Sequence, residues 1–159
     1  MKRRIAVMMA AFTTMALLVG LVATSSAVGF KKDAAEGCTP GYWKQSQHFG
    51  NWADPYDPAD TFVGAGPTGG PYFEAVAGHG TVTLLQVLQQ GGGGWHAAGR
   101  HLVAALLNAS SGIDFAYSPD EVVTAFQTAW NSNPQGDPSA LKEMFEDYNE
   151  LGCPLGRAE

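Results

Sequence analysis

Basic residues are scarce in this sequence, and it contains only one long hydrophobic run. Nine Lys and Arg stand against fifteen Asp and Glu in 159 residues. This excess of negative charge disfavours nucleic acids and anionic membrane surfaces as partners, and we expect no nucleic-acid partner. Specific catalytic and cofactor motifs are lacking too, since the chain has no Gly-x-Ser-x-Gly elbow, phosphate-binding loop or His-Glu-x-x-His pattern. We therefore expect no cofactor and assign no catalytic residue.

The hydrophobic run lies at the N-terminus, from Ile5 to Ala23, directly after three basic residues at positions 2–4. The small residues Ser25-Ser26-Ala27 follow it and form a good signal-peptidase site. This order predicts a cleavable secretory signal over residues 1–27. The alternative is an uncleaved membrane anchor, because the run approaches the length of a spanning helix. No second apolar segment is that long, so we expect no stable membrane span after cleavage.

Cleavage would leave 132 of the 159 residues, which is the size of one domain. All fifteen acidic residues would remain with six Lys and Arg, which gives a net charge of −9. We divide this part into a flexible lead over residues 28–37, a helical extracellular domain over 38–155 and a tail over 156–159.

The only two cysteines lie near the two ends of that domain, at Cys38 and Cys153. In an oxidising compartment an even number of cysteines predicts pairing. Closing so long a loop stabilises the fold by about 4 to 5 kcal/mol in the chain-entropy model. Two free thiols are the alternative. A zinc site is disfavoured, because there is no close second pair of ligands.

Most of the domain is predicted to be helical, because capping residues and apolar repeats recur along it. A hydroxyl or acidic residue suited to cap a helix precedes four of the apolar segments. The segment from Leu102 to Leu107 is apolar on nearly every side, as expected of a helix surrounded by others. The predicted helices cover residues 42–48, 83–90, about 95–108, 119–130 and 138–151.

The region between the first two helices, residues 51–80, is rich in Gly and Pro and is predicted to be a long loop. Only residues 113–117 have the character of an extended segment, and no strand pairs are evident. The predicted fold is therefore all-α: a small single-domain bundle of about five helices with a long Gly/Pro-rich loop, closed by one disulfide.

Two motifs carry a family resemblance: Cys38-Thr39-Pro40-Gly41-Tyr42-Trp43-Lys44 near the start of the domain and Leu151-Gly152-Cys153-Pro154-Leu155 at its end. With the glycine run 91–94 and residues 100–109 between them, the chain resembles a family of uncharacterised secreted or cell-surface bacterial proteins. The resemblance covers nearly the whole domain. It implies an extracellular module and carries over no catalytic residue.

The first motif is also the start of an aromatic cluster that could hold a sugar or a peptide. The alternative is that rings close to a disulfide pack over it as core. We favour the core for Trp43, with its ring near Phe145 or Tyr148, and leave Trp52 open between the two. The candidate binding patch comprises Tyr42, Trp43, Lys44, His48, Phe49 and Trp52.

The ionisable residues match no metal template, so no metal site is predicted. Asp54, Asp57 and Asp60 lack the glycine and the final glutamate of a calcium loop, and we interpret them as solvated acids that cap turns. His101 adjoins the apolar run and is predicted to be a hydrogen-bonded core histidine. Arg100 is predicted to pair with an acid of the last helix or a loop. The glycine run 91–94 is interpreted as a flexible connection between helices.

We therefore predict an extracellular structural or interaction module that binds a protein or glycan partner at the cell envelope or matrix. The alternative is a secreted hydrolase that uses His48 or His101 with a nearby acid. A histidine, an acid and a nucleophile converging in a deep pocket would favour the enzyme. A closed core with a flat aromatic patch would favour the module.

Overall fold

The computed structural model describes residues 33, 36–62, 82–132 and 136–156. The predicted signal segment, most of the predicted lead, part of the Gly/Pro-rich loop and residues 157–159 lie outside these residues. In the described part of the chain no helix is both long and apolar enough to cross a membrane.

The described residues form a helical domain, which confirms the predicted fold class. The α-helices are α1 (Pro40–Trp43), α2 (Leu84–Gln89), α3 (Trp95–Ser110), α4 (Pro119–Asn131) and α5 (Pro138–Asn149), and the 3-10 helices are η1 (Ser46–Asn51) and η2 (Pro154–Gly156). Within the described ranges the extended backbone makes only isolated bridges, between Gly37 and Gly152 and between Thr61 and Thr83. The segment 113–117 forms no strand.

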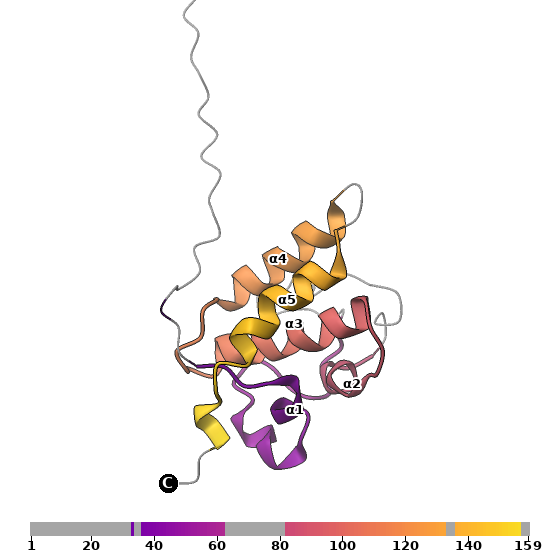
Figure 1. Ribbon diagram of the computed structural model, residues 1–159. Coiled ribbons are helices and arrows are strands. Elements are labelled where there is room, and N and C mark those ends of the chain that lie inside the picture. The colour runs from indigo at the N-terminus through magenta and orange to yellow at the C-terminus, as the bar shows by residue number, and fades with distance from the viewer. Residues whose placement is uncertain (1–32, 34–35, 63–81, 133–135, 157–159) are drawn as a thin grey trace, which may run out of the picture.

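The central position predicted for the apolar helix is confirmed. Helix α3 packs against α1, α2, α4 and α5, and it lies in the middle of the domain in Figure 1. From Leu102 to Leu107 its side chains are at most 1% exposed. Neighbours on every side explain why this stretch is apolar around its whole circumference.

Local capping sets the start of each surrounding helix. The hydroxyl of Thr83 accepts from the backbone N–H of Gln86, whose side chain accepts from the Thr83 N–H in return. Ser118 and Glu121 form the same reciprocal pair at the start of α4. Each pair satisfies two backbone donors that the first helical turn would otherwise leave free.

The first predicted helix is corrected in its bounds. In place of one helix over 42–48, α1 begins at Pro40 and ends at Trp43, and the 3-10 helix η1 runs on to Asn51. Gln45 lies between them in extended conformation, and its side-chain amide donates to the carbonyl of Gly41. That carbonyl would accept from the Gln45 backbone N–H in a continuous α-helix, so the side chain replaces the bond that would extend α1.

The end of the last helix differs as well. Leu141 and Phe145 are buried on α5, but α5 ends at Asn149 and not at the predicted Leu151, which is 45% exposed. The chain has left the helical path by Leu151, so the 3.6-residue repeat no longer points its side chain at the core. Gly152 follows in a left-handed conformation with φ +119°, which glycine adopts without strain.

Candidate functional site

The predicted disulfide between Cys38 and Cys153 is present, with the two Cα atoms 4.4 Å apart. It joins residues separated by 115 positions and leaves no free cysteine, so the free-thiol alternative was wrong. Next to it, the N–H of Gly37 donates to the carbonyl of Gly152 at 3.1 Å. The chain from Cys38 to Trp52, which we call the anchored turn, is therefore tied to the end of the domain.

A second anchor is Asn108, a fully buried residue near the end of α3. Its side-chain oxygen accepts from the N–H of Cys38 at 2.9 Å and from the indole N–H of Trp43 at 3.0 Å. Its amide nitrogen donates to the carbonyl of Cys38 and to the side-chain oxygen of Asn149, at 2.9 and 2.8 Å. One side chain thus holds the anchored turn against α3 and α5.

Sequence reasoning missed this role of Asn108. The available signal was a lone amide directly after the apolar run Leu102–Leu107. A polar side chain beside a buried run is likewise buried, and it costs free energy there unless it is hydrogen-bonded. The three partner residues lie 41 to 70 positions away along the chain. No local pattern identifies them.

The two tryptophans of the predicted patch belong to the interior. Trp43 is 0% exposed, as predicted for core, and Trp52 is 9% exposed and donates its indole N–H to the carbonyl of Trp43. The anchored turn packs on α3 and α2. The rings of Phe145 and Tyr148 both pack edge-on against Tyr117. The expected closeness of Trp43 to one of these two rings stays a prediction.

The other four patch residues lie at the surface. Lys44 is exposed, and Tyr42, His48 and Phe49 are half-buried. The imidazole of His48 stacks on the Tyr42 ring, with centroids 3.9 Å apart and planes at 18°. Asn51 donates its side-chain N–H to the Tyr42 hydroxyl at 2.5 Å. The surface of the anchored turn therefore includes a fixed pair of stacked rings, and Lys44 is exposed on the same segment.

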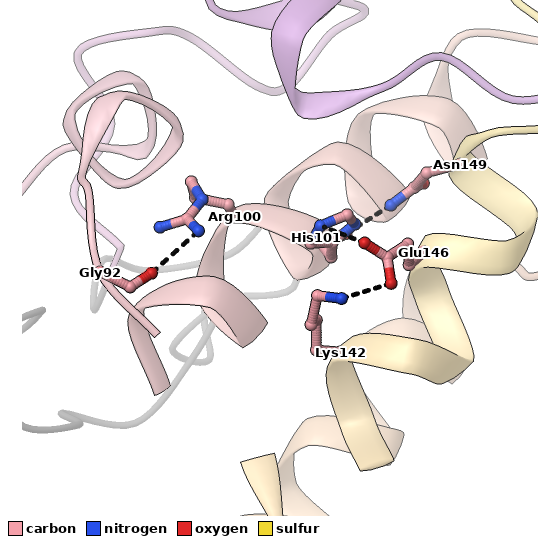
Figure 2. A network of polar contacts seen from close by, with 6 residues as sticks. All are labelled: Gly92, Arg100, His101, Lys142, Glu146 and Asn149. Carbon is pink, nitrogen blue, oxygen red and sulfur yellow. Dashed lines mark hydrogen bonds and ion pairs between the residues drawn. The ribbon is translucent and has the colours of Figure 1, made fainter. Parts of the chain in front are cut away.

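His101 lies elsewhere, on the side of α3 that faces α5 (Figure 2). Its Nε2 is 3.6 Å from Oε1 of Glu146, and Lys142 bonds the other oxygen of that carboxylate. The residue is 8% exposed, so its predicted burial is confirmed. The predicted hydrogen bond is not confirmed, because Nδ1 of His101 is buried and has no partner among the described residues.

This geometry favours a neutral imidazole. A protonated ring would place a charged N–H at Nδ1 with nothing to receive it. Burial lowers the pKa of His101, and the nearby Glu146 carboxylate opposes that shift only in part. The hydrogen bond from Lys142 lowers the pKa of Glu146 below its usual value.

We predict that acid destabilises the domain through His101. Its pKa in the folded state is below the unfolded value of 6.5, so the unfolded chain binds a proton first as the pH falls. The stability is complete above pH 6.5 and declines as the pH drops toward the folded pKa. Urea midpoints measured above and below pH 6.5 should show this loss, and it should be smaller in His101→Gln. An equal loss in His101→Gln would assign the effect to other groups.

Arg100 corrects the prediction of an acidic partner. Its guanidinium donates to the backbone carbonyls of Gln90 and Gly92, at 2.8 and 3.0 Å. Figure 2 shows the bond to Gly92. Gly92 and Gly94 have positive φ angles, which let the chain turn back so that these carbonyls face α3. The arginine thus fastens the connection between α2 and α3.

Asp57 and Asp60 act in turns, as predicted. Asp57 accepts from the N–H of Ala59, and Asp60 accepts from the N–H of Asp57, both at 2.8 Å. Among the described residues, no three His, Cys, Asp or Glu come together in a way that could hold a metal ion.

Two open clefts lie away from the anchored turn's stacked rings. One, of about 310 Å³, is lined by Asp54, Pro55, Tyr56, Ser110, Pro119 and Asp120. The other, of about 410 Å³, lies between α4 and α5 and is mostly apolar. Neither histidine of the hydrolase alternative, His48 or His101, lines either of these clefts.

Comparison with known proteins adds no relative. No protein-family model matches the chain, and neither a curated protein nor a solved structure matches it. The function has to be inferred from the geometry above.

Proposed function

We propose that the protein is an extracellular interaction module that binds a protein or glycan partner through the surface of the anchored turn. The observation that carries the proposal is the stacked pair of Tyr42 and His48, which stays partly exposed on a segment fixed by both the disulfide and Asn108. Aromatic rings at a surface supply large contact areas for sugars and peptides.

The anchoring supports the proposal because a fixed surface loses little conformational entropy on binding. Trp43 lies beneath the surface rings, with Tyr42 packed edge-on against it at 5.1 Å. The disulfide holds Cys38 at the start of the turn. A partner would therefore meet rings that are already in place.

The extracellular location rests on three supports. The N-terminal sequence has the features of a secretory signal, and the motifs around Cys38 and Cys153 resemble those of secreted or cell-surface proteins. The disulfide itself is typical of oxidising compartments.

One observation favours the hydrolase alternative, namely the pairing of His101 with the acid Glu146. A hydrolase would also need a nucleophile or an activated water and an open site for the substrate. His101 is 8% exposed, and the serine nearest to it in sequence on α3, Ser110, donates its hydroxyl to the carbonyl of Leu106. The interaction module is therefore the better supported function.

We predict that Tyr42→Ala and His48→Ala each weaken partner binding by about tenfold, as expected for ring contacts at the centre of an interface. Purified protein immobilised through its C-terminus would be tested against envelope and culture-supernatant fractions and on a glycan array. His96→Ala is the matched control, because His96 is also half-buried but lies on α3. If all three variants capture the partner equally well, the anchored turn is not the binding surface.

A further inference from the structure

The anchored turn carries no acidic residue, although the protein as a whole is acidic. From Gly37 to Ala53 there is no Asp or Glu, although the chain carries fifteen. The basic residues in this stretch are Lys44 and His48. The described stretch 82–113 also lacks Asp and Glu, but the surface proposed for binding is the acid-free segment that carries an exposed lysine.

Among the described residues, Lys44 is the one lysine or arginine whose side chain is left available for a partner. Of the described residues of these two types, Arg100 is bound to backbone carbonyls and Lys142 to Glu146. The exposed Lys44 side chain makes no hydrogen bond or ion pair with any described residue. Its ammonium group can thus pair with a partner without breaking a contact of the protein.

The groups around Lys44 are suited to sugar rings. The Tyr42 hydroxyl accepts from Asn51 and keeps its own proton to donate. The side-chain amide of Gln47, the residue before His48, donates to Gln45. The side-chain oxygen of Gln47 is therefore left as an acceptor. Ring faces with hydroxyl and amide groups at their edges match the apolar faces and the hydroxyl edges of a sugar.

We infer that the partner is a carboxylated polysaccharide, with sugar rings lying on the Tyr42–His48 stack and a carboxylate paired with Lys44. This inference rests on the proposed function and narrows its partner to one chemical class. Charge complementarity separates it from a neutral glycan, and the exposed amides and stacked rings separate it from a merely acidic peptide.

The test compares three polymers on the purified, disulfide-bonded protein: polygalacturonate, its fully methyl-esterified form and polyglutamate. Polygalacturonate should bind, and esterification should abolish most of that binding because it removes the charge and keeps the sugar chain. Lys44→Ala should weaken binding by about fivefold, as expected for one exposed charge contact. Added salt should weaken binding to the wild-type protein.

Lys142→Ala is the matched control, since it removes the same charge from α5 and should bind polygalacturonate like the wild type. Equal binding of the two galacturonate polymers would overturn the requirement for charge and leave the proposed module intact. Polyglutamate binding as tight as polygalacturonate would overturn the requirement for sugar. Failure to bind any polymer would overturn the inference, whereas the capture experiment with Tyr42→Ala tests the proposed function separately.

Discussion

Replacing Asn108 with leucine is expected to lower the free energy of unfolding by at least about 4 kcal/mol. The substitution removes both halves of the amide and leaves the N–H and the carbonyl of Cys38, the indole N–H of Trp43 and the side-chain oxygen of Asn149 without their partner. Each buried polar group left unsatisfied costs about 1 to 3 kcal/mol. The loss should exceed that of any single surface substitution.

Urea unfolding of the oxidised protein would measure this loss. Asn131→Leu is the control, because Asn131 is exposed on α4 and its replacement should change the stability by no more than about 0.5 kcal/mol. If Asn108→Leu unfolds at the same urea concentration as the wild type, Asn108 is not the hub of the interior.

Trp43→Ala is expected to destabilise the domain by about 3 to 5 kcal/mol, as a large-to-small change in a fully buried position. Reduction of the disulfide is expected to cost a comparable amount, about 4 to 5 kcal/mol, because the unfolded chain regains the freedom of a long loop. Trp43→Phe should cost less than Trp43→Ala, because it retains a six-membered ring in the core. Both variants lose the bond to Asn108.

When Trp43→Ala is combined with reduction of the disulfide, the total loss of stability should be smaller than the sum of the two separate losses. Trp43 and Cys38 share the oxygen of Asn108, so loosening either end of the anchored turn weakens the contacts of the other. Trp130 provides the control, because it is a half-buried tryptophan on α4 that packs on Trp95 and Phe126. Full additivity for Trp43→Ala, like that expected for Trp130→Ala, would show that the tryptophan and the bridge act independently.

Features that depend on neighbours in sequence could be predicted from the sequence. The capping pairs at Thr83 and Ser118 involve residues three positions apart, and the all-apolar run of α3 reports burial on every side. The disulfide was predicted from there being only two cysteines in a chain with a predicted export signal. In each case the physical cause lies within one helical turn or in the composition.

Features that depend on distant partners were decided only by the tertiary structure. An amide in an apolar helix signals a buried bond, but the fold alone brought Cys38, Trp43 and Asn149 to Asn108. Arg100 needs a counterpart in any fold, and the glycine turns at 92 and 94 made carbonyls nearer than an acid.

The aromatic patch shows the same division within a few residues. Sequence alone placed six candidate residues in one segment of the chain, because rings, a lysine and a histidine recur there. The break of α1 at Gln45 and the packing of the turn on α3 then placed Trp43 and Trp52 inside and left Tyr42 and His48 at the surface. Composition determines which groups are available for binding, whereas the path of the backbone determines which of them solvent and a partner can reach.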